Sequence, residues 1–266
     1  MLVGIRVEDL YVDYGEKEVV KGVNLNIEDG QVVTIIGPNG SGKSTILKSI
    51  SRCLKPVNGT VYLDNENIYK INTKKVAQEL AILPQVKNVS ADVSVEELVS
   101  YGRYPHLGFR KKLMKEDHKI VDWAIEKTGL ERLRKRFVAT LSGGERQRAW
   151  IAMSLAQKPR ILLLDEPTTF LDISFQIEVL ELVKELNESL GLTVVMVLHD
   201  LNQAARYSDK IVVIDKGMLS SSGSPEEIIS NSLLEDVFRI EADIYDDSVN
   251  ECPYFIPKKV RRVVNQ

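Results

Sequence analysis

The chain has 266 residues, of which 44% are hydrophobic and 27% are charged, a length that allows one large domain or one domain with an inserted subdomain. The formal net charge is −3, so the composition indicates no general attraction to nucleic acid. No stretch approaches the ~18 consecutive apolar residues of a membrane span, and Met1–Glu8 lacks the uncharged core of a signal peptide. The three histidines and two cysteines lack the spacing of metal ligands or of a disulfide framework, which favours a reducing cytoplasm.

The N-terminal part of the chain predicts short strands and one helix. Residues 2–25 alternate in the manner of strands with a turn near Gly15, and Val32–Ile36 is typical of a buried strand. Apolar residues then recur at helical spacing over 46–54 until Pro56 ends the pattern. Another short strand is expected at 59–64.

The middle of the chain changes character twice. Between about residues 87 and 158 strand patterns vanish and charge rises, so we expect a helical insertion. Strand, helix and strand patterns return afterwards at 161–164, 174–190 (a helix stopped by Gly191), 193–198 and 211–214. This order predicts a parallel sheet covered on both faces.

The C-terminal part predicts one more helix and a free end. Ser224 is a helix cap, Pro225 suits the first helical position and Glu227 follows at the capping-box spacing, so we expect a helix to about Phe238. We interpret the basic run 258–262 as a solvated end of the chain.

One glycine-rich segment has the spacing G-x-x-x-x-G-K-[ST], in which backbone N–H groups converge on phosphate oxygens. Lys43 would place a positive charge near the β- and γ-phosphates, and the Ser44 hydroxyl can ligate Mg²⁺. The segment follows a predicted strand and opens a predicted helix, whose N-terminus favours an anion. We call it the glycine loop, and it consists of Gly37, Pro38, Asn39, Gly40, Ser41, Gly42, Lys43, Ser44 and Thr45.

Two carboxylates end the predicted strand at 161–164. Asp165 and Glu166 would lie at the carboxyl edge of the parallel sheet, where ligands gather. One carboxylate there can hold Mg²⁺, while its neighbour can orient or deprotonate a water aimed at the γ-phosphate. Many ordinary strands also end with four apolar residues followed by Asp-Glu. The pair therefore indicates a site for metal and water only because the chain also contains the glycine loop.

A second glycine-rich segment heads the last helix of the insertion. Ser142, Gly143 and Gly144 form a helix start without side-chain bulk, and such an end can touch a phosphate directly. Ser142 would suffice for an ordinary capped helix, whereas two consecutive glycines at that position cost stability.

At this point the chain resembles the nucleotide-binding subunit of ATP-binding cassette (ABC) transporters over nearly its whole length. Gly37–Thr45 is similar to the family's Walker A motif, Leu141–Gln147 to its signature motif and Ile161–Glu166 to its Walker B motif. Four further elements follow the family order: Tyr14 as the aromatic that stacks on adenine, Gln85 in the Q-loop, Asp172 in the D-loop (Thr169–Asp172) and His199 as the switch histidine.

Each of these four residues also has an ordinary structural explanation. Tyr14 is equally compatible with a strand-edge aromatic, and Gln85 with a plain loop glutamine. His199 follows an apolar strand and could be a satisfied histidine, while Asp172 could cap the helix that follows it.

The resemblance implies an α/β fold. Its parts would be a P-loop NTPase (RecA-like) core with a parallel sheet, an N-terminal antiparallel β subdomain and an inserted α-helical subdomain. The implied boundaries are 1–86 and 159–240 for the core with its β subdomain, 87–158 for the helical subdomain and 241–266 for a C-terminal tail.

The resemblance also implies an ATPase that uses ATP and Mg²⁺ as a homodimer. Each ATP would lie between the glycine loop of one copy and Ser142–Gly144 of the other. The implied catalytic residues are Glu166 as base, His199 as γ-phosphate sensor and Gln85, which touches the metal or water; Mg²⁺ would be held by Ser44, Asp165 and Gln85.

Within the family, the chain is similar to the ATPases of importers for iron–siderophore, haem and vitamin B12. Such a subunit would bind peripherally at the cytoplasmic face of the membrane, to a separate permease served by a periplasmic or lipoprotein substrate-binding protein, with no nucleic acid. Val86–His106 would form much of the permease groove. The branch similarity rests on 102–106, 148–150, 168–173 and 199–206.

Three classes of function compete. A transport ATPase is favoured, whether for these chelates or for another importer's cargo. A soluble ABC protein acting on DNA or ribosomes would need heptad arms or a second cassette, and the chain contains neither. A scaffold that does not hydrolyse ATP would be expected to lack the base, yet Glu166 is present.

Overall fold

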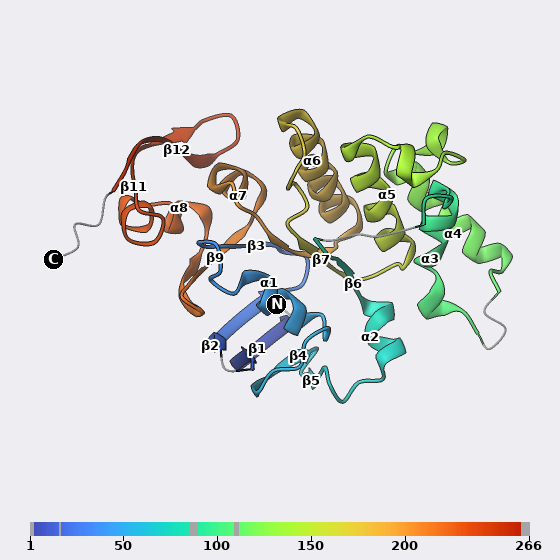
Figure 1. The fold of residues 1–266 in the computed structure, drawn as a ribbon, viewed down its shortest axis with the longest axis horizontal. Helices are drawn as coiled ribbons and strands as arrows, with labels where there is room; N and C mark the ends of the chain where they lie inside the picture. The colour runs from blue at the N-terminus through green and yellow to red at the C-terminus, as the bar shows by residue number, and fades with distance from the viewer. Residues whose placement is uncertain (1–2, 16, 86–89, 109–111, 262–266) are drawn as a thin grey trace. The chain divides into compact units, whose positions relative to one another are not determined.

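The computed structural model describes residues 3–15, 17–85, 90–108 and 112–261. The chain forms two compact units (Figure 1), which are described separately: residues 1–67 with 195–266, and residues 68–194. No helix among the described residues is long and apolar enough to span a membrane. The subdomain boundaries expected at 87, 159 and 241 stay a prediction.

The first unit contains the predicted antiparallel part. Its sheet has the order β2-β1-β4-β5, and every pairing is antiparallel. Gly15 lies in the turn between the first two strands with a φ of 73°, which confirms the turn expected there. The four strands are β1 (Val3–Tyr14), β2 (Lys17–Glu28), β4 (Asn58–Leu63) and β5 (Glu66–Asn67).

The first unit also contains parallel strands around the glycine loop. β3 (Val32–Ile36) is buried throughout and pairs in parallel with β9 (Lys210–Asp215), while β10 (Met218–Gly223) runs antiparallel to β9. α1 (Lys43–Ile50) begins inside the glycine loop, as predicted, and α7 (Leu201–Tyr207) follows β8 (Thr193–Val197). The strands predicted at 32–36, 193–198 and 211–214 are therefore confirmed.

The helix predicted from Ser224 to Phe238 is interrupted. The expected capping box between Ser224 and Glu227 is present, but α8 spans only Pro225–Ile228. Ile229 leaves the helical conformation with a ψ of 99°, and both it and Ile228 are buried. A separate π-helical turn, η4 (Leu233–Val237), follows. The prediction of one continuous helix was wrong because burial of the two isoleucines redirects the backbone.

Residues 240–260 form a hairpin, so residues 258–260 of the basic run are exposed to solvent as expected but belong to a strand. β11 (Ile240–Asp247) pairs antiparallel with β12 (Cys252–Val260). Lys258 and Lys259 form cross-strand ion pairs with Asp243 (2.5 Å) and Glu241 (3.1 Å). The run of basic residues made a strand improbable from the sequence, and these ion pairs neutralise two of its charges across the hairpin. Arg262 lies outside the described residues.

The second unit pairs two parallel strands, β6 (Leu80–Leu83) and β7 (Ile161–Asp165), of which β6 was not predicted. Gly191, with a φ of 65°, ends α6 (Ile173–Leu190), as expected. Among the described residues from 90 to 158 the structure contains only helical elements and one isolated bridge. The remaining elements are α2 (Thr73–Glu79), α3 (Val95–Tyr101), η1 (Tyr104–His106), α4 (Lys115–Lys127), η2 (Glu131–Leu133), η3 (Val138–Thr140) and α5 (Gly143–Ala156).

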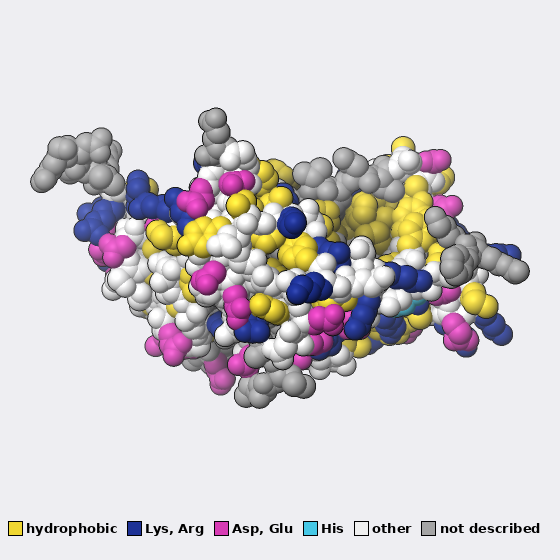
Figure 2. Space-filling view, turned by 90° about the horizontal axis from the view of Figure 1, so that it is seen from below, with side chains coloured by type: hydrophobic (Ala, Val, Ile, Leu, Met, Phe, Trp, Pro, Cys, Tyr) yellow, Lys and Arg dark blue, Asp and Glu magenta, His cyan; other side chains and the backbone are white. Residues whose placement is uncertain are grey.

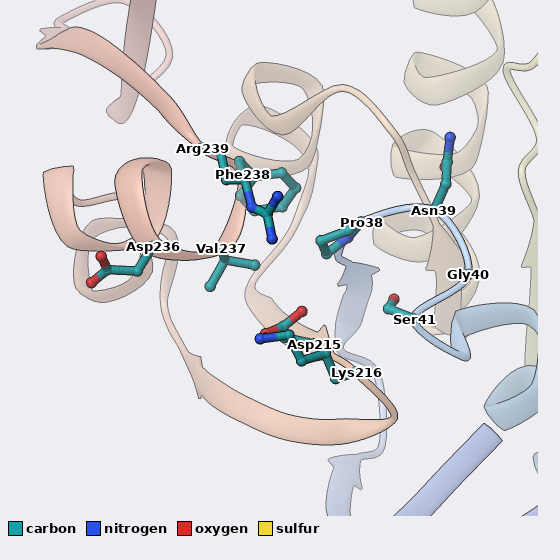
Figure 3. A pocket seen from close by; sticks show the side chains of 10 residues that line it. All are labelled: Pro38, Asn39, Gly40, Ser41, Asp215, Lys216, Asp236, Val237, Phe238 and Arg239. Carbon is teal, nitrogen blue, oxygen red and sulfur yellow. The ribbon is translucent and has the colours of Figure 1, made fainter. Parts of the chain in front are cut away.

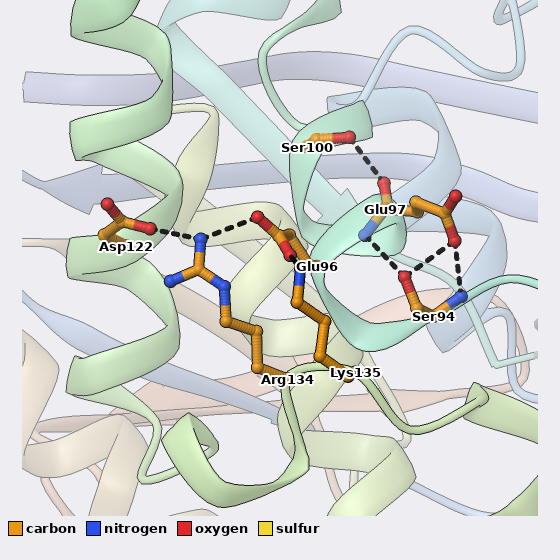
Figure 4. Close-up of polar contacts among 7 residues, drawn as sticks. All are labelled: Ser94, Glu96, Glu97, Ser100, Asp122, Arg134 and Lys135. Carbon is orange, nitrogen blue, oxygen red and sulfur yellow. Dashed lines mark hydrogen bonds and ion pairs between the residues drawn. The ribbon is translucent and has the colours of Figure 1, made fainter.

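A polar cluster joins the helices of the second unit (Figure 4). Glu96, in the first turn of α3, accepts a hydrogen bond of 2.7 Å from Arg134 and contacts Lys135. Arg134 also pairs with Asp122 of α4 at 2.5 Å. The Arg134 hydrogen bond, helped by Lys135, lowers the pKa of Glu96 from 4.5 to about 2. The cluster therefore ties α3 and α4 to the segment after η2.

Candidate functional site

The glycine loop lies directly on the end of β9. Gly37 has a φ of 151°, and a Cβ atom at this position would lie 2.0 Å from the carbonyl oxygen of Ile214. Gly42, with a φ of 103°, is the cap residue of α1 and provides no side-chain hydrogen bond there. Glycine therefore suits both positions, because Gly37 packs directly on the backbone of β9 and Gly42 has a positive φ.

The Lys43 side chain folds back over this loop. Its Nζ atom donates to the carbonyl oxygens of Gly37 (2.8 Å) and Pro38 (3.0 Å), and the residue is only 5% exposed. A buried ammonium group is costly unless acceptors surround it. The loop therefore holds a positive charge at its centre before any anion binds.

Ser41 provides an independent indication of a ligand. The residue is 3% exposed, and among the described residues its buried Oγ has no hydrogen-bond partner. A hydroxyl that is buried without a hydrogen-bond partner is less stable than the same hydroxyl in water. A phosphate oxygen would supply the missing acceptor. The first turn of α1 contains no acidic residue and its cap makes no side-chain bond, so its N–H groups face the loop without a competing anion. These residues fit a polyphosphate.

The other loop residues differ in burial. Thr45 is buried, Pro38 and Ser44 are half-buried, and Asn39 and Gly40 are exposed.

A pocket of about 440 Å³ lies on one side of the glycine loop (Figure 3). It is bounded by Pro38–Ser41, by Asp215 and Lys216 after β9, and by Asp236–Arg239 at the end of η4. Nothing in the sequence pointed to this pocket, because it depends on segments almost 200 residues apart (residues 38 and 236). We call it the loop-side pocket.

The first unit also contains Tyr14 and His199. Tyr14 ends β1 and is 54% exposed, so an aromatic face is open to solvent there. His199 follows β8 and is exposed. His199 lies between the end of β8 and the start of α7. Asp200 caps α7, because its side chain accepts the Gln203 N–H at 3.0 Å.

The second unit brings the two predicted carboxylates to the end of β7. Asp165 is buried, with 3% exposure, whereas Glu166 is half-buried and takes a left-handed φ of 53°. The Glu166 carboxylate accepts hydrogen bonds from Gln85 Nε2 at 2.5 Å and from Thr169 Oγ1 at 3.1 Å. Strained backbone of this kind concentrates at functional sites. Neither contact was predicted from the sequence, where the resemblance implied only that Gln85 touches the metal or water.

The signature segment (Leu141–Gln147) starts α5 as predicted, with a more elaborate cap. Ser142 Oγ accepts the Glu145 N–H at 3.3 Å, and the Glu145 carboxylate accepts the Ser142 N–H at 2.8 Å. This backbone hydrogen bond from Ser142 lowers the pKa of Glu145. The S-x-x-E spacing could have revealed this capping box in the sequence.

The two glycines of the signature segment are explained by packing in the structure. A Cβ atom at Gly144 would lie 2.4 Å from Phe175 Cδ1, and one at Gly143 would lie 3.1 Å from Leu171 Cδ2. Gly144 is buried, whereas Ser142 and Gly143 are exposed. The glycines therefore let the start of α5 approach the start of α6, which keeps a narrow helix end exposed.

The segment before α6 carries two unusual side chains. Asp172 is the N-cap residue of α6, as the alternative expected, although its side chain forms no cap hydrogen bond. Phe170 is 97% exposed and takes a left-handed φ of 65°.

The predicted site residues thus fall into two groups. Tyr14, the glycine loop and His199 belong to the first unit, where Lys43 and the loop carbonyls are in contact. The second unit holds Gln85, Ser142–Gly144, Asp165, Glu166 and Asp172. Within it, Gln85 meets Glu166, and the signature segment meets the start of α6.

Comparison with known proteins agrees with this assembly of motifs. Residues 20–169 match the family model of the ABC transporter. The chain is 48% identical to the petrobactin import ATP-binding protein FpuC of Bacillus anthracis, over 97% of this chain and 94% of that protein. It is 46% identical to the iron(3+)-hydroxamate import ATP-binding protein FhuC of Bacillus subtilis, over 90% and 89% of the two chains.

A solved structure gives the same result for the fold. The dimeric structure of MJ0796, a bacterial ABC transporter cassette, matches with a TM-score of 0.73 and 32% identity, over 83% of this chain and 98% of that one. The α/β cassette fold expected from the sequence is therefore confirmed. With a family match over more than half of the chain and relatives of nearly equal length, the chain belongs to the ABC transporter family, as an ATP-binding subunit that hydrolyses ATP.

Proposed function

We propose that this ATPase powers the import of an iron–siderophore or a related metal chelate through a separate membrane permease. The relatives FpuC and FhuC act in petrobactin and iron(3+)-hydroxamate import, and their similarity extends over nearly the whole chain. The observation that carries the ATPase chemistry is the Glu166 carboxylate, which Gln85 and Thr169 hold at the end of a buried strand.

The phosphate end of the nucleotide would bind to the glycine loop. The N–H groups at the start of α1 and the Lys43 ammonium group would face the β- and γ-phosphates, and Ser41 Oγ would gain its missing acceptor. Tyr14, exposed at the end of β1, would stack on adenine.

The metal would be Mg²⁺, which supplies Lewis-acid charge at the β- and γ-phosphate oxygens. Its ligands would come from Ser44, Asp165 and Gln85, a hydroxyl, a carboxylate and an amide oxygen, which are the hard donors that Mg²⁺ prefers. The Gln85 side chain has one amide oxygen for the metal and one amide nitrogen, which donates to Glu166. It would thereby link metal and base.

Glu166 would accept a proton from the attacking water. The hydrogen bonds from Gln85 and Thr169 orient the carboxylate, and a general base must be correctly oriented before its pKa matters. His199, exposed after β8, would donate a hydrogen bond to the γ-phosphate and register its presence.

A second copy of the chain would complete each site. Ser142 and Gly143 are exposed at a narrow helix start suited to a γ-phosphate, with Gly144 buried behind them, and the MJ0796 cassette with a similar fold is dimeric. ATP would thus hold two copies together, and hydrolysis would let them separate.

The permease would bind to the second unit. A pocket of about 440 Å³ there is lined by Lys74, Tyr104, Leu107 and Gly108, and Tyr104 is 60% exposed. Figure 2 shows hydrophobic side chains gathered in a hollow on the right of the view. Of the four pocket residues, Tyr104 falls within the groove expected at Val86–His106, and residues 86–89 of that stretch lie outside the described residues. The subunit would then work at the cytoplasmic face of the membrane, and the substrate-binding protein would reach it only through the permease.

The experiment that tests this proposal is reconstitution of the subunit with its permease and substrate-binding protein in liposomes. A ferric siderophore is expected to stimulate ATP hydrolysis and to accumulate inside the liposomes only when ATP is present on the side of this subunit. Ferric hydroxamate, ferric catecholate, haem and cobalamin should be compared, with iron-free siderophore as the control. Stimulation by none of these chelates would contradict the proposed cargo class.

A further inference from the structure

A pair of hydrogen bonds joins the C-terminal hairpin to the helix that follows His199. Asn202, in the first turn of α7, donates from its side-chain amide to the Phe255 carbonyl oxygen at 3.2 Å. The Asn202 amide oxygen accepts the Phe255 N–H at 3.0 Å. One side chain thus pairs with both backbone groups of a residue on β12, 53 positions further along the chain. Two such bonds fix the position of that residue as a neighbouring strand would.

Asn202 occupies the free edge of β12. The hairpin is a sheet of two strands, so β11 covers one edge of β12 only. Phe255 lies opposite Ile244 of β11 in the register, and both of its backbone groups bond to Asn202. In an antiparallel strand each residue turns its N–H and C=O to the same edge, so these two groups face away from β11. Without Asn202 the backbone of a residue that is only 9% exposed would lose its partners.

The position of α7 depends on its neighbours. The helix has only seven residues, and a helix of this length is not stable by itself in water. It packs on β3, on α8 and on β12, and α8 in turn packs on β12 (Figure 1). The hairpin and the two short helices therefore hold one another, and Asn202 adds a directional link between them.

His199 lies between a strand end and this helix. On one side, Leu198 donates to the Ile35 carbonyl oxygen of β3 at 3.3 Å, which fixes the strand end in the sheet. On the other side, Asp200 caps α7 and Asn202 follows three positions after His199. A displacement of α7 would therefore move His199 relative to the glycine loop, which begins directly after β3.

We propose that the hairpin of residues 240–260 acts through Asn202 to position His199 for its contact with the γ-phosphate. This inference rests on the proposed function, in which His199 donates to the γ-phosphate. Asn202 and Phe255 are positioning residues, because they act on the nucleotide only through His199. The inference gives a role to residues 199–206, one of the stretches that carry the branch similarity, and to a hairpin that the sequence alone predicts as a tail.

A double-mutant cycle between Asn202 and His199 tests the proposal. ATP turnover at saturating ATP and Mg²⁺ is measured for the subunit bound to its permease. Asn202→Ala should lower kcat roughly three- to tenfold with little change in KM, because the buried side chains of Cys252 and Phe255 keep the hairpin attached while His199 loses its fixed position.

The second half of the cycle separates positioning from a general loss of structure. His199→Ala removes the donor to the γ-phosphate, so kcat should fall roughly 100-fold. Adding Asn202→Ala to that chain should change kcat by less than about twofold, since there is no longer an imidazole to position. A substitution that merely loosens the fold would lower kcat by the same factor in both chains.

Asn24→Ala is the matched control. The Asn24 side chain exchanges two hydrogen bonds of 3.0 Å with Asp9, between β1 and β2 of the same unit. The substitution removes at least as many hydrogen bonds as Asn202→Ala, yet kcat should stay within about twofold of the parent.

Asn202→Asp gives the same test if Asn202→Ala does not fold. The aspartate keeps an acceptor for the Phe255 N–H but places a carboxylate oxygen against the Phe255 carbonyl oxygen. It should therefore also lower kcat roughly three- to tenfold, and only in the chain that retains His199.

Hydrogen exchange tests the physical link without an activity measurement. In Asn202→Ala, the amides of residues 200–207 and 252–257 should exchange at least roughly tenfold faster than in the parent, whereas those of β3 should not change. Mass spectrometry of peptides from these segments measures the rates. Unchanged exchange in both segments would contradict a link between the hairpin and α7.

The outcomes separate this inference from the proposed function. If His199→Ala lowers kcat but Asn202→Ala does not, or if Asn202→Ala lowers kcat by the same factor with and without His199, positioning by the hairpin is wrong while His199 keeps its role. If His199→Ala turns over ATP as fast as the parent, the assignment of His199 is wrong and this inference with it.

Discussion

Gln85 and Glu166 are 81 positions apart in the chain, yet the Gln85 side-chain amide donates to the Glu166 carboxylate at 2.5 Å. The parallel pairing of β6 with β7 produces this contact, since Leu83 lies opposite Leu164 at the ends of the two strands. The residue expected to touch the metal or water is thereby in direct contact with the residue expected to act as base.

Replacing Glu166 by glutamine tests the base. Glu166→Gln keeps the size of the side chain but removes the proton acceptor, so ATP turnover should fall by roughly 100-fold or more. ATP binding and ATP-dependent dimerisation should persist, as measured by equilibrium binding and sedimentation. Undiminished ATPase activity would contradict the assignment of Glu166.

Thr169 is expected to position the base. Thr169→Val removes the hydroxyl that donates to Glu166 at 3.1 Å, and kcat should fall roughly three- to tenfold with little change in KM. Thr169→Ser, which keeps the donor, should restore most of kcat. Equal melting temperatures of the two variants would exclude a merely structural effect, and an unchanged kcat in Thr169→Val would remove Thr169 from the mechanism.

The shape of the glycine loop can be tested with two similar substitutions. Gly37→Ala places a Cβ atom 2.0 Å from the Ile214 carbonyl oxygen, so it should cost about 3 kcal/mol or more and abolish ATP binding. Gly40→Ala meets nothing within 4 Å and should cost only about 1 kcal/mol for its positive φ. Chemical denaturation measures both, and equal losses would contradict the close packing of Gly37 on β9.

The polar cluster at α3 should make stability depend on pH. The pKa of Glu96 is lowered from 4.5 to about 2, so its contribution is fully present above pH 4.5 and is lost as the pH falls toward 2. Glu96→Gln should lower the free energy of unfolding by about 1 kcal/mol at neutral pH, because solvent screens a side chain that is 25% exposed. The difference from the parent should shrink below pH 4.5.

The control for this titration is Glu116→Gln. Its pair with Lys119 is an exposed contact within one helix, with side chains 75% and 62% exposed. Denaturation of this variant should show no measurable change at any pH. A pH-independent loss in Glu96→Gln would mean that packing, not ionisation, accounts for the effect.

The predictions from the sequence that proved correct concern residues close together in the chain. The strand at Val32–Ile36, the helix that opens at Lys43 and the stop of α6 at Gly191 all follow from local patterns. The helix expected to reach Phe238 failed because burial of Ile228 and Ile229, which depends on distant segments, ended α8 early. The hairpin of residues 240–260 was missed because its charged residues are balanced only across the two strands.

The sequence by itself determined the family and the chemical groups of the site. Motif spacing is a local property of the chain, and the glycines at positions 37, 40 and 42 permit the positive φ values of the loop. Only the tertiary structure decided what surrounds each group: the donors on Glu166, the packing of Gly144 on Phe175, the loop-side pocket and the exposure of Phe170. These features arise where strands and helices distant in sequence pack together, and no local pattern encodes the position of such a neighbour.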